Sequence, residues 1–336
     1  MTTPEFDLAN REDRNKLSKR LLADIDTYCR TAFNDGHRTH LGASLINREC
    51  SRYLWYVFRW VYNKEFDGRM QRLFQRGHRE EEFMLKMLEG IGCNVSPVDY
   101  EAPNVLHYNT VTGLYHYETT FKGDGKVIVE ANTEHGVTEA ESQGVYPDYP
   151  QHRVSGCEGH FGGSIDNLLE LPKQYNLFVM FINEFKTQAT GAKFTALMRD
   201  GVQKEKPDHY TQMCIYGWKK GHKYGVYMAA NKNDDSLHVE VVELDWELAQ
   251  RMEAKAHRII FSRTPPQKLS ESLAHSTCQY CDMKEVCHQA KPYEKNCRSC
   301  AHAQAIPGKQ WGCNLHGQVI PATFIPTGCN SWTPAV

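Results

Sequence analysis

The spacing of the cysteines constrains this fold more than any other feature of the sequence. The chain has 336 residues and 12 cysteines, and most of these crowd its C-terminal part. The crowded ones are Cys278, Cys281, Cys287, Cys297, Cys300, Cys313 and Cys329. Disulfide frameworks are rare in reducing compartments, so clustered thiols indicate metal ligands. Metal ligation fixes the position of every segment that carries a ligand.

Two separate cysteine sets are apparent. The first, C-x2-C-x5-C at Cys278, Cys281 and Cys287, is one thiolate short of what a cubane cluster or tetrahedral zinc requires. A fourth ligand must therefore come from elsewhere. The second set can bind zinc with four thiolates, and nearby histidines are substitute donors; the residues are Cys297, Cys300, Cys313 and Cys329, with His302 and His316. We predict a zinc-ribbon-like tail with structural Zn²⁺ over residues 291–336, after one larger domain over residues 1–290.

Composition predicts a folded chain and excludes few functions. Hydrophobic residues make up 40% and charged residues 24%, with a formal net charge of -2. This is enough apolar material for a core, and any contact with nucleic acid must use local basic patches. The N-terminus lacks an apolar leader, and no stretch is apolar enough to span a membrane. We therefore expect a soluble cytoplasmic protein.

Charged residues end one strongly apolar stretch in a distinctive way. The run over residues 177–182 predicts a buried strand and leads directly into Glu184 and Lys186. Residues two apart in a strand project from one face, so these two side chains share one space. Asp166 ends a Gly-rich segment spaced for an adjacent strand, which brings a second carboxylate close. Two carboxylates suffice to hold Mg²⁺, with Lys186 placed to orient water and stabilise a phosphate.

A third predicted helix, from about Asp67 to Gly90, has a polar interruption in its apolar face. The apolar stripe comprises Met70, Leu73, Phe74, Gly77, Met84 and Leu88. Glu81 lies within this stripe and His78 lies at its edge. Either the helix is half exposed, or Glu81 points at a partner, because carboxylates are rarely buried alone.

The remaining pattern alternates helices and strands. Helices are expected over residues 15–34, 46–63, 206–219 and 246–261, and strands over 223–232 and 237–246. Residues 100–150 are polar and suggest β-hairpins or a long excursion, while 263–272 resemble a linker. The predicted fold class is α/β, with a mixed central sheet flanked by helices and a small cysteine-rich metal-bound tail.

These motifs, in this order, resemble the PD-(D/E)XK nucleases, and in particular their RecB-like branch. They are R-G-H-R-E-E-E at residues 76–82, G-G-S-I-D ending at Asp166, N-E-F-K ending at Lys186, and Q-M-C-I-Y from Gln212 to Tyr216. The resemblance implies a restriction-endonuclease-like core with Mg²⁺ or Mn²⁺ on Asp166, Glu184 and either His78 or Glu81. It also implies that Gln212 and Tyr216 support the catalytic site and DNA. The crowded acidic run leaves open which of its residues binds metal.

The same resemblance suggests the missing thiolate of the first cysteine set. Some RecB-like members, including AddB-type subunits and CRISPR-adaptation exonucleases, hold a 4Fe-4S cluster on one early and three late cysteines. Cys50, in E-C-S-R-Y-L-W-Y, matches the early position, which implies a cluster on Cys50, Cys278, Cys281 and Cys287. The alternative is zinc on the late cysteines alone, with Cys50 as a buried apolar residue.

A basic run precedes the last motif and has two interpretations. Arg199, Lys204, Lys206 and His209 lie just before Gln212 and could grip a DNA backbone or form a solvated face. The expected activity is a metal-dependent DNA exonuclease acting on ends in recombination, repair or phage DNA processing. DNA is the expected partner, and a recombination or single-strand-binding protein is a candidate. An endonuclease or nickase of the same fold, or a non-catalytic DNA-binding scaffold, is the alternative.

Overall fold

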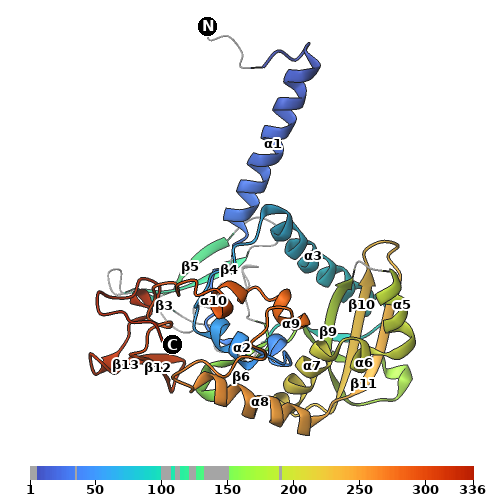
Figure 1. Ribbon diagram of the computed structural model, residues 1–336. Helices are drawn as coiled ribbons and strands as arrows, with labels where there is room; N and C mark the ends of the chain where they lie inside the picture. Colours follow the sequence, from blue (N-terminus) through green and yellow to red (C-terminus); the bar gives the residue numbers. More distant parts are fainter. Residues whose placement is uncertain are drawn as a thin grey trace.

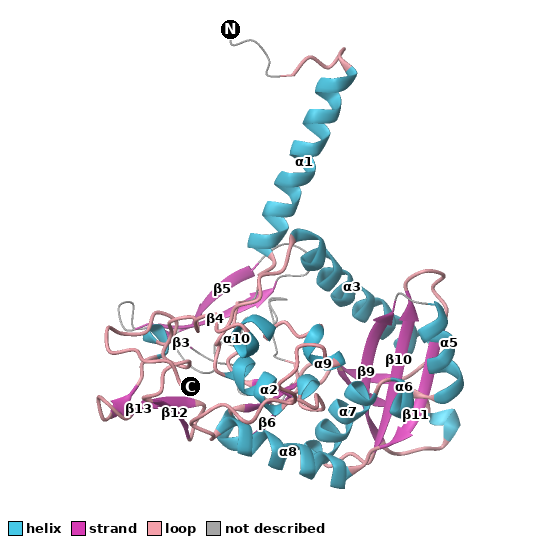
Figure 2. Cartoon of the chain, viewed as in Figure 1, coloured by secondary structure: helices cyan, strands magenta, loops and turns pink. Residues whose placement is uncertain are grey.

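The structure is a computed structural model. It describes residues 6–34, 36–99, 107–109, 114–120, 126–131, 151–188 and 191–336. Figures 1 and 2 show a mixed α/β body from which one long helix, α1 (Arg11–Ala32), projects. Within the described residues, no helix is both long and apolar enough to cross a membrane.

A five-stranded mixed sheet forms one side of the body. Its strands, in spatial order, are β11 (Leu237–Glu243), β10 (Tyr224–Asn231), β9 (Met180–Gln188), β8 (Asn167–Glu170) and β2 (Asn94–Ser96). β9 and β10 are parallel, and the other pairs are antiparallel. β9 is central and residues 181–185 are all buried, as expected for a strand covered on both faces. The strand predicted from the apolar run is confirmed from Met180 onward, but residues 177–179 of that run precede β9 and are exposed.

Helices cover this sheet on both sides. α3 (Gly68–Gly90) packs Met84 and Leu88 against Phe185 of β9. α7 (Pro207–Lys220) and α8 (Trp246–Ile260) belong to the larger core on the opposite side, and the short helices α5 (Gly191–Asp200) and α6 (Val202–Glu205) lead into α7. The expected stripe of α3 is only partly buried, because Phe74 is 41% exposed.

A second, three-stranded sheet connects distant parts of the sequence. Its order is β1 (Leu41–Gly42), β7 (Phe161–Ser164) and β6 (Arg153–Gly156), with β1 parallel to β7. After β1 and a 3-10 turn at Ala43–Leu45, α2 spans only Ser51–Phe58. Cys50 has extended backbone and its sulfur accepts from the amide of Tyr53, so the helix begins later than the 46–63 pattern predicts.

The segment after β2 contributes a third sheet made only of antiparallel pairs. Its strands are β3 (His107–Asn109), β4 (Leu114–Thr120) and β5 (Lys126–Ala131), in agreement with the expected hairpins. The rest of the predicted excursion over residues 100–150 lies outside the described residues.

The C-terminal segment is built from short helices and strands of two to five residues each. It contains α9 (Ser276–Gln279), α10 (Lys284–His288), β12 (Ala303–Ile306), β13 (Gln310–Cys313) and β14 (Gln318–Val319), and the three strands form one antiparallel sheet. Further 3-10 turns lie at Cys157–Gly159, Lys173–Tyr175 and Ala322–Phe324.

The C-terminal sheet shares the main hydrophobic core. Trp311 is 2% exposed and its ring lies 5.3 Å from that of Phe58 in α2. Ala335, also 2% exposed, belongs to the same core. Two fully buried arginines strengthen this junction: Arg59 donates to the carbonyls of Ser262, Arg298, Cys300 and Ala303. Arg298 stacks on Phe58, Trp60 and Trp311 at 4.3 to 4.8 Å.

Candidate active site

Two carboxylates and a lysine meet where β8 and β9 lie side by side. β9 supplies Glu184 and Lys186, while Asp166 lies in the bend between β7 and β8. The amide of Phe185 donates to Asp166 Oδ2 at 2.9 Å, which holds that carboxylate against β9. Lys186 Nζ donates to Glu184 Oε1 and lies 3.9 Å from Asp166 Oδ2. The amine therefore lies between two acids.

The electrostatics of this centre are dominated by burial and by repulsion between acids. Glu184 is fully buried, and burial raises its pKa, with the charge of Asp166 acting in the same direction and Lys186 opposing. Burial lowers the pKa of Lys186, but Glu184 and Asp166 outweigh it and the net shift is upward. The lysine is thus held in its charged form. One cation compensates part of the negative charge of these acids.

Glu81 of α3 completes the acidic group. It lines a pocket between α3 and the end of β9 together with Gly77, Met84, Phe185, Lys186 and Thr187. Burial and the charge of Asp166, opposed by Lys186, together raise the pKa of Glu81 to about 7. His78, the other sequence candidate, is exposed. Of the two, only Glu81 faces the carboxylates.

Gln212 and Tyr216 support the centre from α7. Gln212 Nε2 lies 3.2 Å from Glu184 Oε2 and 3.2 Å from Tyr216 Oη, and it donates to both. The spacing of four residues places both side chains on one helix face. Gly163 of β7 lies directly against the Tyr216 hydroxyl, where a Cβ would collide. The Gly-rich approach to Asp166 therefore makes room for this tyrosine.

Sequence reasoning missed two further polar residues beside this centre. Tyr227 of β10 is the strand partner of Glu184, and its hydroxyl lies 2.9 Å from His209 Nδ1. Gln188 donates to the same hydroxyl at 3.4 Å. Gln188 could have been found, because it follows Lys186 by two residues in the same strand. Tyr227 had no comparable signal, since its position depends on strand pairing.

The predicted basic run is divided between different environments. Arg199 and Lys204 are exposed and both form ion pairs with Asp200, at 2.6 and 3.3 Å. His209 is partly buried against Tyr227; burial, with the charges of Lys186 and Lys206 acting in the same direction, lowers its pKa to about 3. Of these residues, His209 lies nearest the carboxylates, and it is neutral there.

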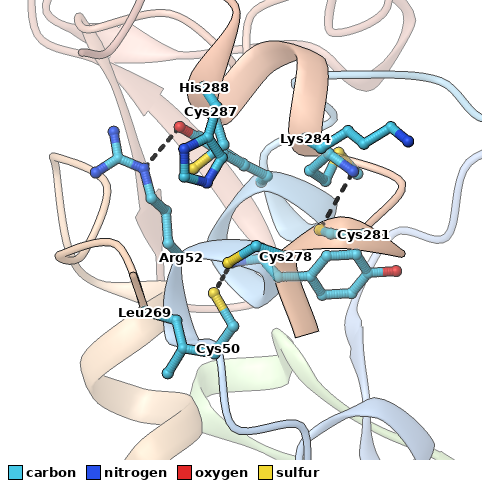
Figure 3. Close-up of a pocket in the computed structure, with 11 residues that line it drawn as sticks. Cys50, Arg52, Leu269, Cys278, Cys281, Lys284, Cys287 and His288 are labelled. Atoms are coloured by element: carbon cyan, nitrogen blue, oxygen red, sulfur yellow. Dashed lines mark hydrogen bonds between the residues drawn. The ribbon is translucent and has the colours of Figure 1, made fainter. Parts of the chain in front are cut away.

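The first cysteine set converges in space. Cys50, at the start of α2, lines one pocket with Cys278, Cys281 and Cys287, which belong to the α9–α10 segment. Figure 3 shows the sulfur atoms of Cys50 and Cys278 pointing toward one another. Burial raises the pKa of Cys287, Arg52 and Lys268 oppose it, and Cys50 and Cys278 are near enough to raise it further. The four thiols therefore surround one space.

The second set converges in the same way. Burial raises the pKa of Cys297, and Cys329, Cys300 and Cys313 each raise it further. These positions come from the loop before β12, the end of β13 and the final turn. As placed, no three His, Cys, Asp or Glu side chains of the described residues have the spacing of an assembled metal site. In the carboxylate centre and in each cysteine set, the donor side chains face one another across a space of their own, but they are not drawn together on a single point.

Comparisons with known proteins give only distant likenesses. No family model and no curated protein matches this chain. An alkaline exonuclease from Laribacter hongkongensis is similar in structure, with 13% identity, TM-score 0.34, and coverage of 69% of this chain and 90% of that one. The structure of SSO0001 gives 12% identity, TM-score 0.36, and coverage of 81% and 96%. The structure of the same exonuclease in complex with dAMP gives 12% identity, TM-score 0.32, and coverage of 66% of this chain and 86% of that one. These scores are too low to support an inference about fold or activity.

Proposed function

We propose that this protein is a metal-dependent nuclease that hydrolyses phosphodiester bonds of DNA. The observation that carries the proposal is the group of Asp166, Glu184 and Glu81 around the single amine of Lys186. Asp166 raises the pKa of both glutamates, so the three acids repel one another. A divalent cation relieves such repulsion, and carboxylate oxygens are the donors that Mg²⁺ and Mn²⁺ prefer.

The roles follow from the positions of the side chains. Asp166, Glu184 and Glu81 would hold Mg²⁺ or Mn²⁺, which when bound polarises a scissile phosphate and acidifies a water molecule. Lys186 orients that water and stabilises negative charge on the phosphate. Gln212 donates one hydrogen bond to the Glu184 carboxylate, which fixes its orientation, and a second to the Tyr216 hydroxyl. In the balanced step, water adds to phosphorus, one P–O bond breaks, and the departing oxygen takes up a proton.

The cysteine sets are proposed to be structural metal sites. Cys50, Cys278, Cys281 and Cys287 offer four thiols around one pocket, which fits the donor set of a 4Fe-4S cluster. Cys297, Cys300, Cys313 and Cys329 offer four more, which fits Zn²⁺. The first group would tie the C-terminal segment to the start of α2, and the second would cross-link the C-terminal segment to itself.

An exonuclease acting on DNA ends is the favoured form of the activity, based on the RecB-like motif order. An endonuclease or nickase is the second candidate, because the same acids serve either outcome. The test is an assay with end-labelled linear DNA and covalently closed circular DNA, each with Mg²⁺ and with Mn²⁺.

Three results of this assay are distinct. Release of label from linear DNA alone supports an exonuclease, and cleavage of circles establishes an endonuclease or nickase. Binding without cleavage of either substrate, by protein with its full metal content, would replace the nuclease with a DNA-binding scaffold. Glu184→Gln is the matched control, since it keeps the size of the side chain and removes its charge.

A further inference from the structure

A second set of charged side chains lies outside the carboxylate centre. Arg38, in the loop before β1, Arg153 of β6 and Lys309, in the turn between β12 and β13, are all exposed. The three-stranded sheet brings the segments of Arg38 and Arg153 together, because β1 pairs with β7 and β7 pairs with β6. Lys309 joins them from the C-terminal sheet, because its amide donates to the Glu158 carbonyl just after β6. His40 lies among them: burial lowers its pKa to about 4, and Lys309, Arg38 and Arg153 all act in the same direction.

The cations of this basic cluster (Arg38, Arg153 and Lys309) have no acidic partners among the described residues, where no ion pair involves any of the three. Beneath them, Arg298 is fully buried and donates to the carbonyls of Arg38 and Thr39 at 3.4 and 3.3 Å. Its Nε and Nη2 atoms have no hydrogen-bond partner in the described part of the chain. Positive charge thus accumulates on one surface and directly below it.

Lys309 is held in this position by unusual backbone. Three consecutive residues, Cys157, Glu158 and Gly159, have positive φ of 47°, 57° and 88°. Lys309 itself has φ 61°, and its amide donates to the Glu158 carbonyl at 2.8 Å. Positive φ at residues other than glycine is unfavourable and persists where surrounding structure enforces it. The β12–β13 turn is therefore fixed against the body rather than free.

The basic cluster is also connected to the proposed catalytic centre. Arg38 Nη1 lies against Gly42 of β1, at 3.4 Å from where a Cβ would stand. Burial raises the pKa of Tyr216, and Arg38 is near enough to oppose that shift. β7 runs from this region directly to Asp166. One sheet thus links the cations to the acids.

We infer that Arg38, Arg153 and Lys309 form a binding site for successive phosphate groups of a nucleic-acid strand whose scissile bond lies at Asp166 and Glu184. The inference rests on the proposed nuclease function for its choice of ligand. The site positions the strand through charge and contributes nothing to the reacting atoms. It also gives the C-terminal sheet a role in substrate binding, because Lys309 lies in that sheet's own turn.

The test measures DNA binding as a function of salt concentration. A fluorescein-labelled oligonucleotide is titrated with the full-length Glu184→Gln protein in buffer without added Mg²⁺ or Mn²⁺, so that no cleavage interferes and the proposed structural metals stay bound. Arg153→Gln with Lys309→Gln should weaken binding and lower the slope of log K against log salt by about 1.4 to 2. Arg153→Lys with Lys309→Arg keeps both charges and should restore the slope. Lys19→Gln with Arg30→Gln on α1 removes the same charge elsewhere and should leave the slope unchanged.

The outcomes separate this site from the proposed function. An unchanged slope in the Arg153/Lys309 variant overturns the site, even if wild-type protein cleaves DNA. A lowered slope supports the site, even if wild-type protein with metal cleaves nothing, in which case the nuclease proposal alone fails. Should the double variant melt early, Arg38→Gln provides the same test, because that side chain is exposed. In active protein the double variant should raise KM and leave kcat within about twofold.

Discussion

The molecule buries charge in two regions, and the two are compensated differently. At the end of β9, Asp166, Glu184 and Glu81 share the single ammonium of Lys186. At the junction with the C-terminal sheet, Arg59 and Arg298 have no acidic partner among the described residues and rest on carbonyls and aromatic rings. The acids keep oxygen donors that a cation can use, whereas the donors of Arg59 are largely occupied. The first arrangement suits chemistry and the second suits structure.

The largest expected effect is on catalysis and comes from breaking the acidic region. Glu184→Gln should lower the rate of phosphodiester cleavage by about 10³-fold or more, because one charged ligand and its orientation by Gln212 are lost. Burial disfavours the charged carboxylate, so the melting temperature of this variant should not fall. The two measurements are a cleavage assay and a thermal melt. Full activity in both Glu184→Gln and Asp166→Asn would place the reaction elsewhere.

The next effect extends the comparison to the first cysteine set, whose thiols, like the three acids, are potential metal ligands. Anaerobically purified protein should be brown with about four irons per chain, and Cys50→Ala should lose both. Cys50 is far from Cys278 in the chain, so loss of their link should lower the free energy of unfolding by several kcal/mol, about what a long-loop crosslink contributes. Iron analysis and denaturant titration check this.

The control for the cysteine variant is Cys93→Ala, a buried thiol outside both sets. It should keep its iron and its colour. If Cys50→Ala keeps full iron content while Cys297→Ala loses it, the ligands of the two sets must be exchanged.

A smaller effect distinguishes the two arginines from each other. Arg59 donates to four carbonyls and Arg298 to two. Arg59→Met should therefore destabilise the fold by about 3 kcal/mol, since it strands buried acceptors, and Arg298→Met by about 1 kcal/mol or less. Urea denaturation of both variants provides the values. Equal losses would mean that carbonyl bonds do not determine the contribution of these side chains.

The smallest expected effect concerns pH. His209 is neutral in the folded protein, with a pKa of about 3, and its ordinary value is near 6.5. Below about pH 6.5 the unfolded chain binds a proton that the folded chain does not. The free energy of unfolding therefore decreases as the pH is lowered from about 6.5 to about 3. Between pH 7 and pH 5, His209→Gln should therefore lose about 2 kcal/mol less of its free energy of unfolding than wild type does. If the stability of His209→Gln and of wild type changed with pH in the same way, His209 would have to become protonated in the folded protein.

Much of the fold could be predicted where periodicity is local. The strand that carries Glu184, the helix that carries Glu81 and the two strands after α7 all follow from alternation or helical spacing. The extension of the sheet by β8 and β2 could not be predicted, because strands of three or four residues are too short to show a clear alternation of apolar and polar residues. The pairing of β1 with β7 depends on residues more than a hundred positions apart, which no local window registers.

The arrangement of the site was predictable in part for the same reason. The position of Glu81 within an apolar stripe indicated its inward direction, and E-x-K indicated a shared face. Arg59 and Arg298 gave no such sign, because arginine is usually exposed and both lie in polar or aromatic surroundings. Their burial becomes apparent only when α2 and the C-terminal sheet meet.

The sharing of one core by α2 and the C-terminal sheet has a consequence during synthesis. Trp311 and Ala335 fill space between elements that are translated much earlier, including α2. A nascent chain that has not yet exposed these residues leaves the aromatic side chains of α2 uncovered, with apolar surface open to water. Folding should therefore finish only after the C-terminal sheet leaves the ribosome. Until then, the growing chain is a natural client for chaperones that bind exposed aromatic segments.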